Sequence, residues 1–218
     1  MCRGMARGFF ISLEGGEGAG KSTQAALLDT ALKARSLEVV RTREPGGSPG
    51  AEAIRALLVT GGAERWSPIS ESLLMNAARR DHVERVIAPA LARGAVVVCD
   101  RFADSTRAYQ GAGGGAPADF IAAMEAVVVG DVRPDLTLIL DLPVEIGLAR
   151  AAGRGGGEAR FEGKDLAFHQ RLRAAFLALA SAEPARCVRI DALATSDVVY
   201  AAIWARVSAA LGLDGAAG

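Results

Sequence analysis

The residues best suited to chemistry form one continuous run, Gly15-Gly16-Glu17-Gly18-Ala19-Gly20-Lys21-Ser22. The run fits the pattern G-x-x-x-x-G-K-[ST], whose glycines let backbone N–H groups turn toward a phosphate. The lysine of this pattern reaches the β- and γ-phosphates of a nucleotide, and the serine hydroxyl is an oxygen ligand for Mg²⁺. The alternative is a glycine-rich turn without a ligand. The spacing favours a phosphate-binding loop (P-loop) made of Gly15, Gly16, Glu17, Gly18, Ala19, Gly20, Lys21, Ser22 and Thr23.

This loop needs a strand before it and a helix after it, and the sequence supplies both. Residues 9–13 are an apolar run typical of a buried strand. In residues 23–35, Leu27, Leu28 and Leu32 fall on one helical face. A helix that begins at the loop points its positive end at a bound phosphate, which strengthens the prediction of a phosphate site.

Strands and helices alternate along the rest of the chain. Apolar runs predict further strands at 38–42, 95–100, 136–142 and 187–190, and helical patterns cover 51–59, 69–92, 117–129, 144–152, 166–180 and 196–211. Pro89 is expected to kink the long helix 69–92, and glycines predict a flexible break at 111–115. The glycine-rich stretch 153–157 is expected to be mobile.

This alternation predicts a parallel sheet, which binds ligands beyond the carboxyl ends of its strands. We therefore expect an α/β fold of the P-loop NTPase type. It would be a single domain over residues 1–218, with a five-stranded parallel sheet, helices on both faces and a short mobile lid at about residues 150–165.

Polar side chains that suit phosphoryl transfer follow the predicted strands. Asp100 ends the strand 95–100, where its carboxylate could hold Mg²⁺ or, alternatively, cap the strand. Each nearby arginine taken alone is best explained as a surface residue. Phosphoryl transfer between two anions, however, needs positive charge more than covalent chemistry, and guanidinium groups pair well with phosphate oxygens. The arginines that form this set are Arg43, Arg55, Arg79, Arg101, Arg150, Arg154 and Arg160.

The absence of other motifs reduces the number of reaction types that the chain could catalyse. The chain has no N-K-x-D element for reading guanine, and no histidine or cysteine stands out as a nucleophile. An acceptor that is itself a phosphate already carries an anionic oxygen and needs no strong general base, which favours a nucleoside monophosphate kinase. Two alternatives remain: a P-loop kinase for another monophosphate or a deoxynucleoside, and a P-loop switch or ATPase without an acceptor.

Composition argues against several other classes of protein. Lys+Arg and Asp+Glu are equal at 25 each, so no overall charge attracts nucleic acid or a membrane surface. No apolar run is long enough to span a bilayer, and residues 1–8 lack the apolar core of a signal peptide. The three cysteines have no C-x-x-C spacing. We expect reduced thiols and a cytoplasmic protein.

Taken together, the motifs resemble the bacterial thymidylate kinase family over nearly the whole chain. The resemblance rests on residues 15–23, 42–47 (T-R-E-P-G-G), 77–79, 100–102 (D-R-F), 105–106, 108–111, 133–137, 140–141 and 190–192. It implies that ATP and Mg²⁺ convert dTMP to dTDP, and it implies a homodimer. The family places an assisting arginine either in the P-loop or in the lid. The P-loop here contains none, so the chain resembles the lid-arginine type, with Arg154 in that role.

The resemblance also implies the remaining site residues. Lys21, Arg101 and Arg154 would be catalytic, and Ser22 and Asp100 would bind the metal. The dTMP contacts would come from Glu17, Arg43, Glu44, Arg55, Met75, Arg79, Arg101, Ser105, Thr106 and Tyr109.

Individual dTMP contacts follow from matching positions. Arg55 and Arg101 would hold the dTMP phosphate, Arg79 and Thr106 would bind the thymine ring, and Tyr109 would pack near the sugar C2′. Glu17 would lie near the sugar 3′-hydroxyl.

The chain departs from the family pattern at two positions. Met75 replaces the usual phenylalanine that stacks on the base, and the lid reads A-R-F-E over residues 159–162 where D-R-x-E is common. A thioether can lie against a ring, although Met75 could equally be an ordinary buried helix residue.

Overall fold

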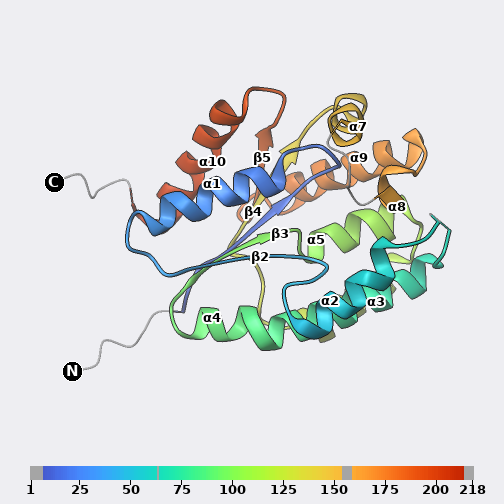
Figure 1. Cartoon of the computed structure of the whole chain (residues 1–218), viewed down its shortest axis with the longest axis horizontal. Helices are drawn as coiled ribbons and strands as arrows, with labels where there is room; N and C mark the ends of the chain where they lie inside the picture. Colours follow the sequence, from blue (N-terminus) through green and yellow to red (C-terminus); the bar gives the residue numbers. More distant parts are fainter. Residues whose placement is uncertain (1–6, 63, 154–158, 214–218) are drawn as a thin grey trace.

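A parallel sheet lies at the centre of the molecule. In the computed structural model, which describes residues 7–62, 64–153 and 159–213, five strands line up in the order β2-β3-β1-β4-β5 (Figure 1). All neighbouring strands are parallel. The strands are β1 (Phe10–Glu14), β2 (Val39–Arg43), β3 (Val96–Asp100), β4 (Leu136–Asp141) and β5 (Cys187–Asp191). The predicted five-stranded parallel sheet is confirmed.

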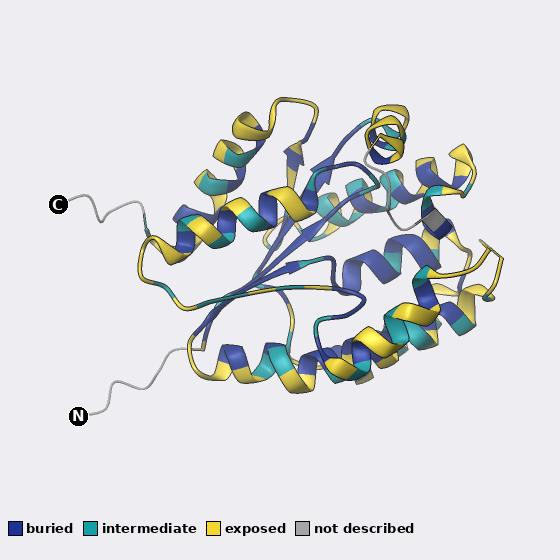
Figure 2. Ribbon diagram, viewed as in Figure 1, coloured by how far each residue is buried: buried dark blue, intermediate teal, exposed yellow. Residues whose placement is uncertain are grey.

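Helices cover both faces of this sheet. One face packs against α1 and α10, and the other packs against η1, α4 and α9. In Figure 1, α1 and α10 lie above the strands and α4 lies below them. Figure 2 shows that burial is concentrated along the strands and the inward helix faces. The helical elements are α1 (Lys21–Lys33), α2 (Pro49–Val59), α3 (Pro68–His82), η1 (Val83–Ile87), α4 (Ala88–Ala92), α5 (Ala103–Thr106), η2 (Arg107–Gly113), α6 (Ala118–Val129), α7 (Val144–Ala152), α8 (Ala159–Glu162), α9 (Leu166–Ala182) and α10 (Ser196–Leu211).

The register of the sheet brings the site segments together. Asp100 of β3 lies opposite Leu13 of β1 on one side and opposite Arg43 of β2 on the other. The ladder continues past the strand ends, because the Arg101 N–H donates to the Leu13 carbonyl at 2.9 Å. The segments that follow these three strands therefore meet at one edge of the sheet.

The predicted long helix 69–92 is divided into α3, η1 and α4. The η1 segment is π-helical, and the Ala88 N–H bonds the carbonyl of Val83, five residues back. Pro89 accounts for this widening, because its ring has no N–H and would meet the carbonyl of Arg85 in a regular α-helix. The expected disturbance at Pro89 is thus a π segment on its N-terminal side.

The helical segment η2 extends into the flexible break that was expected at residues 111–115. The π-helix η2 runs on to Gly113. There η2 crosses α9 so closely that a Cβ on Gly113 would lie 2.7 Å from the Phe168 ring. The glycine at this position serves close packing.

Within residues 7–62, 64–153 and 159–213, no helix combines the length and the apolar character that a bilayer span requires.

Candidate active site

The P-loop connects β1 to α1 and surrounds its own lysine. The Lys21 ammonium donates to the carbonyls of Gly15 at 3.0 Å and Gly16 at 2.8 Å. Burial lowers the pKa of Lys21 to about 8, with a further contribution from the neighbouring charge of Arg101, while the carboxylates of Glu17 and Asp100 oppose the shift. The ammonium therefore lies inside the loop and is charged at neutral pH.

Ser22 and Asp100 lie next to each other beside this lysine. The Ser22 hydroxyl donates to the Asp100 carboxylate, and β3 pairs directly with β1. Hydroxyl and carboxylate oxygens are the ligands that Mg²⁺ prefers. Among the described residues no group of three or more His, Cys, Asp or Glu side chains gathers as a metal site. A Mg²⁺ ion bound by Ser22 and Asp100 would therefore complete its shell with phosphate oxygens and water.

Arg101 joins the P-loop to the next cavity. Its backbone has φ 70°, in the left-handed region that non-glycine residues rarely adopt. From that position the guanidinium donates to the Gly15 carbonyl at 3.1 Å and to Glu17 Oε1 at 3.1 Å. It also lies 4.7 Å from the centre of the Tyr109 ring. The positively charged guanidinium of Arg101 is thus held between the P-loop and the cavity beside Tyr109.

Glu17 is held from two sides. Its Oε1 atom accepts from Arg101 and, at 2.6 Å, from the Tyr109 hydroxyl. Burial raises the pKa of Glu17, but Arg101, Lys21 and the Tyr109 hydroxyl outweigh burial and lower it below its ordinary value. Glu17 is therefore an anion that acts as a hydrogen-bond acceptor.

Next to Arg101 is a cavity with about 330 Å³ of empty space. It is lined by Glu44, Pro45, Met75, Arg79, Arg101, Phe102, Ser105, Thr106, Tyr109, Gln110 and Phe161. This cavity, which we call the acceptor cavity, brings together most of the residues for which the sequence predicted dTMP contacts. Met75 is half-buried in its wall.

Arg79 is fixed deep in the wall of the acceptor cavity. Its side chain is 3% exposed, and its Nε donates to Glu44 Oε2 at 2.7 Å. The Nη2 atom donates to Thr106 Oγ1 at 3.0 Å and to the Phe102 carbonyl at 3.1 Å. Glu44 is held in turn by His82 Nδ1 at 3.0 Å. This network holds the guanidinium in a defined orientation.

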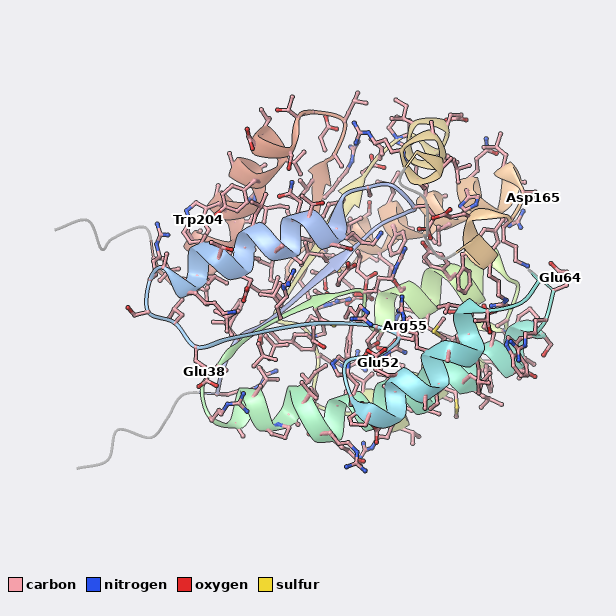
Figure 3. All side chains as sticks on the ribbon, in the orientation of Figure 1. Glu38, Glu52, Arg55, Glu64, Asp165 and Trp204 are labelled. Atoms are coloured by element: carbon pink, nitrogen blue, oxygen red, sulfur yellow. The ribbon has the colours of Figure 1, made fainter. Side chains whose placement is uncertain are left out.

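Three of the residues expected to contact dTMP do not line the acceptor cavity: Glu17 of the P-loop, Arg43 and Arg55. Arg43 is half-exposed and pairs with Glu52 of α2 at 3.1 Å. Arg55 donates to the carbonyl of Pro45, a residue of the cavity wall, at 2.6 Å. Figure 3 shows Glu52 and Arg55 close together on α2. Arg154 lies outside the described residues. The roles of all the predicted site residues stay predictions.

A second cavity adjoins the other end of the P-loop, with about 1020 Å³ of empty space. Its lining comes from Gly18, Ala19, Gly20, Thr23, Gln24, Arg150, Gly153, Ala192, Ala194, Thr195, Ser196 and Val199. Arg150 donates to the carbonyls of Ala192 at 3.1 Å and Leu193 at 3.2 Å. The P-loop is therefore flanked by one space on the Arg101 side and another on the Arg150 side.

Sequence reasoning missed three residues at this edge. Glu14 is fully buried at the end of β1. An acidic residue at the end of an apolar strand is a signal in the sequence that could have identified it. Phe161 lines the acceptor cavity from α8. The A-R-F-E segment that contains it differs from the family pattern, but this difference did not indicate a role for the phenylalanine. Gly147 of α7 touches the P-loop backbone, and nothing in the sequence singled it out.

The fold and these cavities define an α/β protein of the P-loop NTPase class. Comparison with known proteins narrows the class, because the profile of the family described as "Thymidylate kinase" matches residues 13–203. The chain belongs to the thymidylate kinase family.

Individual relatives agree with this assignment. The chain is 68% identical to a thymidylate kinase from Caulobacter vibrioides, over 96% of this chain and 100% of that one. It is 55% identical to a thymidylate kinase from Bradyrhizobium diazoefficiens, over 93% of this chain and 90% of that one. It is also similar to a crystal structure of thymidylate kinase from Ehrlichia chaffeensis, with a TM-score of 0.75 and 33% identity over 92% of this chain and 99% of that one.

Proposed function

We propose that this chain transfers the γ-phosphoryl group of ATP to dTMP, producing dTDP and ADP. The observation that carries the proposal is the position of Arg101, whose guanidinium contacts the P-loop at the Gly15 carbonyl and the Glu17 carboxylate, and also contacts Tyr109 in the wall of the acceptor cavity. A cation there lies between donor and acceptor phosphates, where charge must be stabilised during transfer.

On the donor side, Lys21 exchanges the carbonyls of Gly15 and Gly16 for phosphate oxygens of ATP. Its pKa of about 8 keeps the ammonium charged at neutral pH. Ser22 and Asp100 provide the oxygen atoms that would hold Mg²⁺. When bound, the ion would supply positive charge that neutralises part of the charge on the phosphate oxygens. We further propose that Arg154 supplies positive charge to the transferring group.

On the acceptor side, Arg101 holds the dTMP phosphate in line, with Arg55 and Arg43 contributing from the α2 side. Arg79 and Thr106 donate to the thymine ring, which Met75 faces. The ring of Tyr109 excludes a 2′-hydroxyl.

Three further contacts complete the acceptor site. Glu17 accepts from the sugar 3′-hydroxyl. Glu44 fixes Arg79, and Ser105 stands beside Arg101 at 3.4 Å. The phosphate oxygen of dTMP is already anionic, so the proposed mechanism assigns no general base.

A substrate panel tests the proposal. Purified protein with ATP and Mg²⁺ is offered dTMP, dUMP, dCMP, AMP and thymidine, and products are identified by mass. We expect dTDP, with kcat/KM for dTMP exceeding that for thymidine by at least about 10³, since thymidine lacks the group that Arg101 binds. Phosphorylation of thymidine at comparable efficiency would indicate a deoxynucleoside kinase. ATP hydrolysis without any phosphorylated acceptor would indicate a P-loop ATPase.

We also propose that residues 1–218 act as one domain in a cytoplasmic homodimer. Exposed apolar side chains support the dimer: Ile69 and Leu73 of α3 are 44% and 47% exposed, and Val127 of α6 is 71% exposed. Ile69 and Leu73 lie one turn apart on α3, and α6, which carries Val127, packs against this helix. Apolar side chains of this kind form the centre of homodimer interfaces.

A further inference from the structure

The short helix α8, which carries one wall of the acceptor cavity, is attached to α2 and α3 through Arg160. This side chain is 1% exposed and forms an ion pair with Glu71 of α3. Its Nε donates to the carbonyl of Gly62 at 3.1 Å and its Nη1 to the carbonyl of Leu58 at 3.3 Å. Both carbonyls belong to the C-terminal end of α2 and the loop after it, where helix carbonyls lack intrahelical partners. Arg160 is thus bound to α2 and α3, and none of these partners belongs to the P-loop.

The contacts continue from Glu71 into the cavity wall. While Glu71 Oε2 pairs with Arg160, its Oε1 accepts from Gln110 Nε2 at 2.7 Å. Gln110 is 2% exposed and lines the acceptor cavity. The series Arg160–Glu71–Gln110 therefore connects α8, α3 and η2 through buried polar contacts.

Phe161 follows Arg160 directly and forms part of the same cavity wall. It is 3% exposed and stands edge-on to Tyr109, with ring centres 5.6 Å apart at 89°. The Tyr109 hydroxyl in turn holds Glu17 at 2.6 Å. A displacement of Phe161 would therefore change the cavity and remove one of the ring contacts that support Tyr109.

Other described contacts also hold α8, because the Phe161 ring packs on Tyr109 and the helix contacts α2 and α7. A helix of four residues is not stable by itself. Lys164, just after α8, pairs with Glu64 at 2.7 Å, but Glu64 is 88% exposed, and such surface pairs contribute little. Figure 3 shows Glu64 and Asp165 at the same exposed end of the molecule. Compared with this exposed pair, the buried contacts of Arg160 are the stronger polar attachment of this segment.

We propose that Arg160 is a positioning residue for the acceptor: its contacts with Leu58, Gly62 and Glu71 hold Phe161 and Gln110 in the wall that closes on dTMP. The inference rests on the proposed function of this site. It assigns Arg160 to the acceptor cavity and not to the phosphates of ATP. Loss of these contacts should therefore weaken binding of the acceptor and leave binding of ATP nearly unchanged.

Two variants of the full chain test the inference. Arg160→Lys keeps the charge beside Glu71 but cannot reach both carbonyls. The double variant Arg160→Leu/Glu71→Gln leaves no unpaired charge and keeps an acceptor oxygen for Gln110. KM for dTMP, KM for ATP and kcat are measured, together with the Kd of dTMP by calorimetry without ATP. Lys164→Ala removes the exposed pair on the same segment and serves as the control.

In both variants we expect the KM and Kd of dTMP to rise about 10-fold or more, with the ATP KM within about 2-fold of wild type. Lys164→Ala should leave all three kinetic constants unchanged. An unchanged dTMP KM in folded Arg160→Lys protein would overturn the inference, as would an equal rise in both KM values. A wild-type protein that does not bind dTMP would instead overturn the proposed function, so the two failures are distinct.

Discussion

At the scale of single residues, Glu14 has the most unusual acidity in the site. It is fully buried at the end of β1 and accepts from the Phe102 N–H at 2.7 Å and the Ser105 hydroxyl at 2.5 Å. Burial raises the pKa of Glu14 from 4.5 to about 8, and the charge of Asp104 adds to the shift, whereas the hydrogen bonds and Arg101 oppose it. The folded protein therefore binds a proton that the unfolded chain releases at lower pH.

The raised pKa of Glu14 makes the free energy of unfolding depend on pH. Between pH 4.5 and about 8 the folded state binds more protons than the unfolded state, so the free energy of unfolding falls as pH rises. Glu14→Gln has no proton to lose. We expect its Tm to approach that of wild type near pH 5 and to exceed it by roughly 5 °C or more at pH 8, measured by thermal unfolding. The exposed Glu145→Gln serves as the control and should show no such divergence. Parallel Tm curves for Glu14→Gln and wild type would contradict the raised pKa.

The sequence predicted individual residues unevenly. Lys21, Ser22 and Asp100 could be placed because a motif and a strand end fix their positions. Arg43 and Arg79 looked equivalent in the sequence, yet Arg79 is buried against Glu44 and Arg43 pairs with Glu52 at the surface. The difference in burial between Arg43 and Arg79 depends on which helix packs over each side chain. The spacing of residues along the chain does not predict this packing.

At the scale of elements, α7 supports the P-loop through direct backbone contact. A Cβ on Gly147 would lie 2.5 Å from the Glu17 carbonyl, and one on Gly18 would lie 2.0 Å from the Gly147 carbonyl. These distances are too short for any side chain. The helix and the loop therefore approach through two glycines, and the loop's shape depends on the position of α7.

Gly147→Ala tests this contact. Alanine favours a helix by up to about 1 kcal/mol over glycine, so intrinsic propensity predicts stabilisation. We expect the opposite, because the new methyl group pushes α7 from the P-loop. The Tm should fall, and kcat/KM for ATP should fall by about 10- to 100-fold. Gly111→Ala is the control, since its Cβ would meet its nearest atoms at 3.8 Å. Wild-type ATP kinetics and Tm in Gly147→Ala would refute this role.

Element types were easier to predict than their irregularities. The strands and long helices follow from apolar runs and helical periodicity. The π segments η1 and η2 and the four-residue helix α8 have no periodic signal, because each exists through a local cause. Pro89 widens one helix, Gly113 permits close packing of another, and Arg160 attaches α8 to its neighbours.

At the scale of the whole molecule, the alternation of strands and helices was sufficient to predict the sheet. The strand order β2-β3-β1-β4-β5 explains why distant motifs form one site. Parallel strands place their carboxyl ends on one edge, so segments near residues 15, 44 and 101 meet without any local signal in the chain. The outer surface was harder to predict, since an exposed apolar helix face and an ordinary solvated face differ in only a few residues.

The exposed apolar side chains of α3 and α6 provide the test of assembly. The chain has a mass of 22.5 kDa, and we expect sedimentation to give twice that value for the wild type. Leu73 is 47% exposed and lies one turn from Ile69 on α3, so Leu73→Glu would place a charge in the centre of the interface, where charges are disfavoured. This variant should sediment as a folded monomer. Leu27 of α1 is also exposed, at 38%, but lies on a helix that packs on the other face of the sheet, so Leu27→Glu should remain a dimer. A monomeric wild type at micromolar concentration, or a dimeric Leu73→Glu, would place the interface elsewhere or remove it.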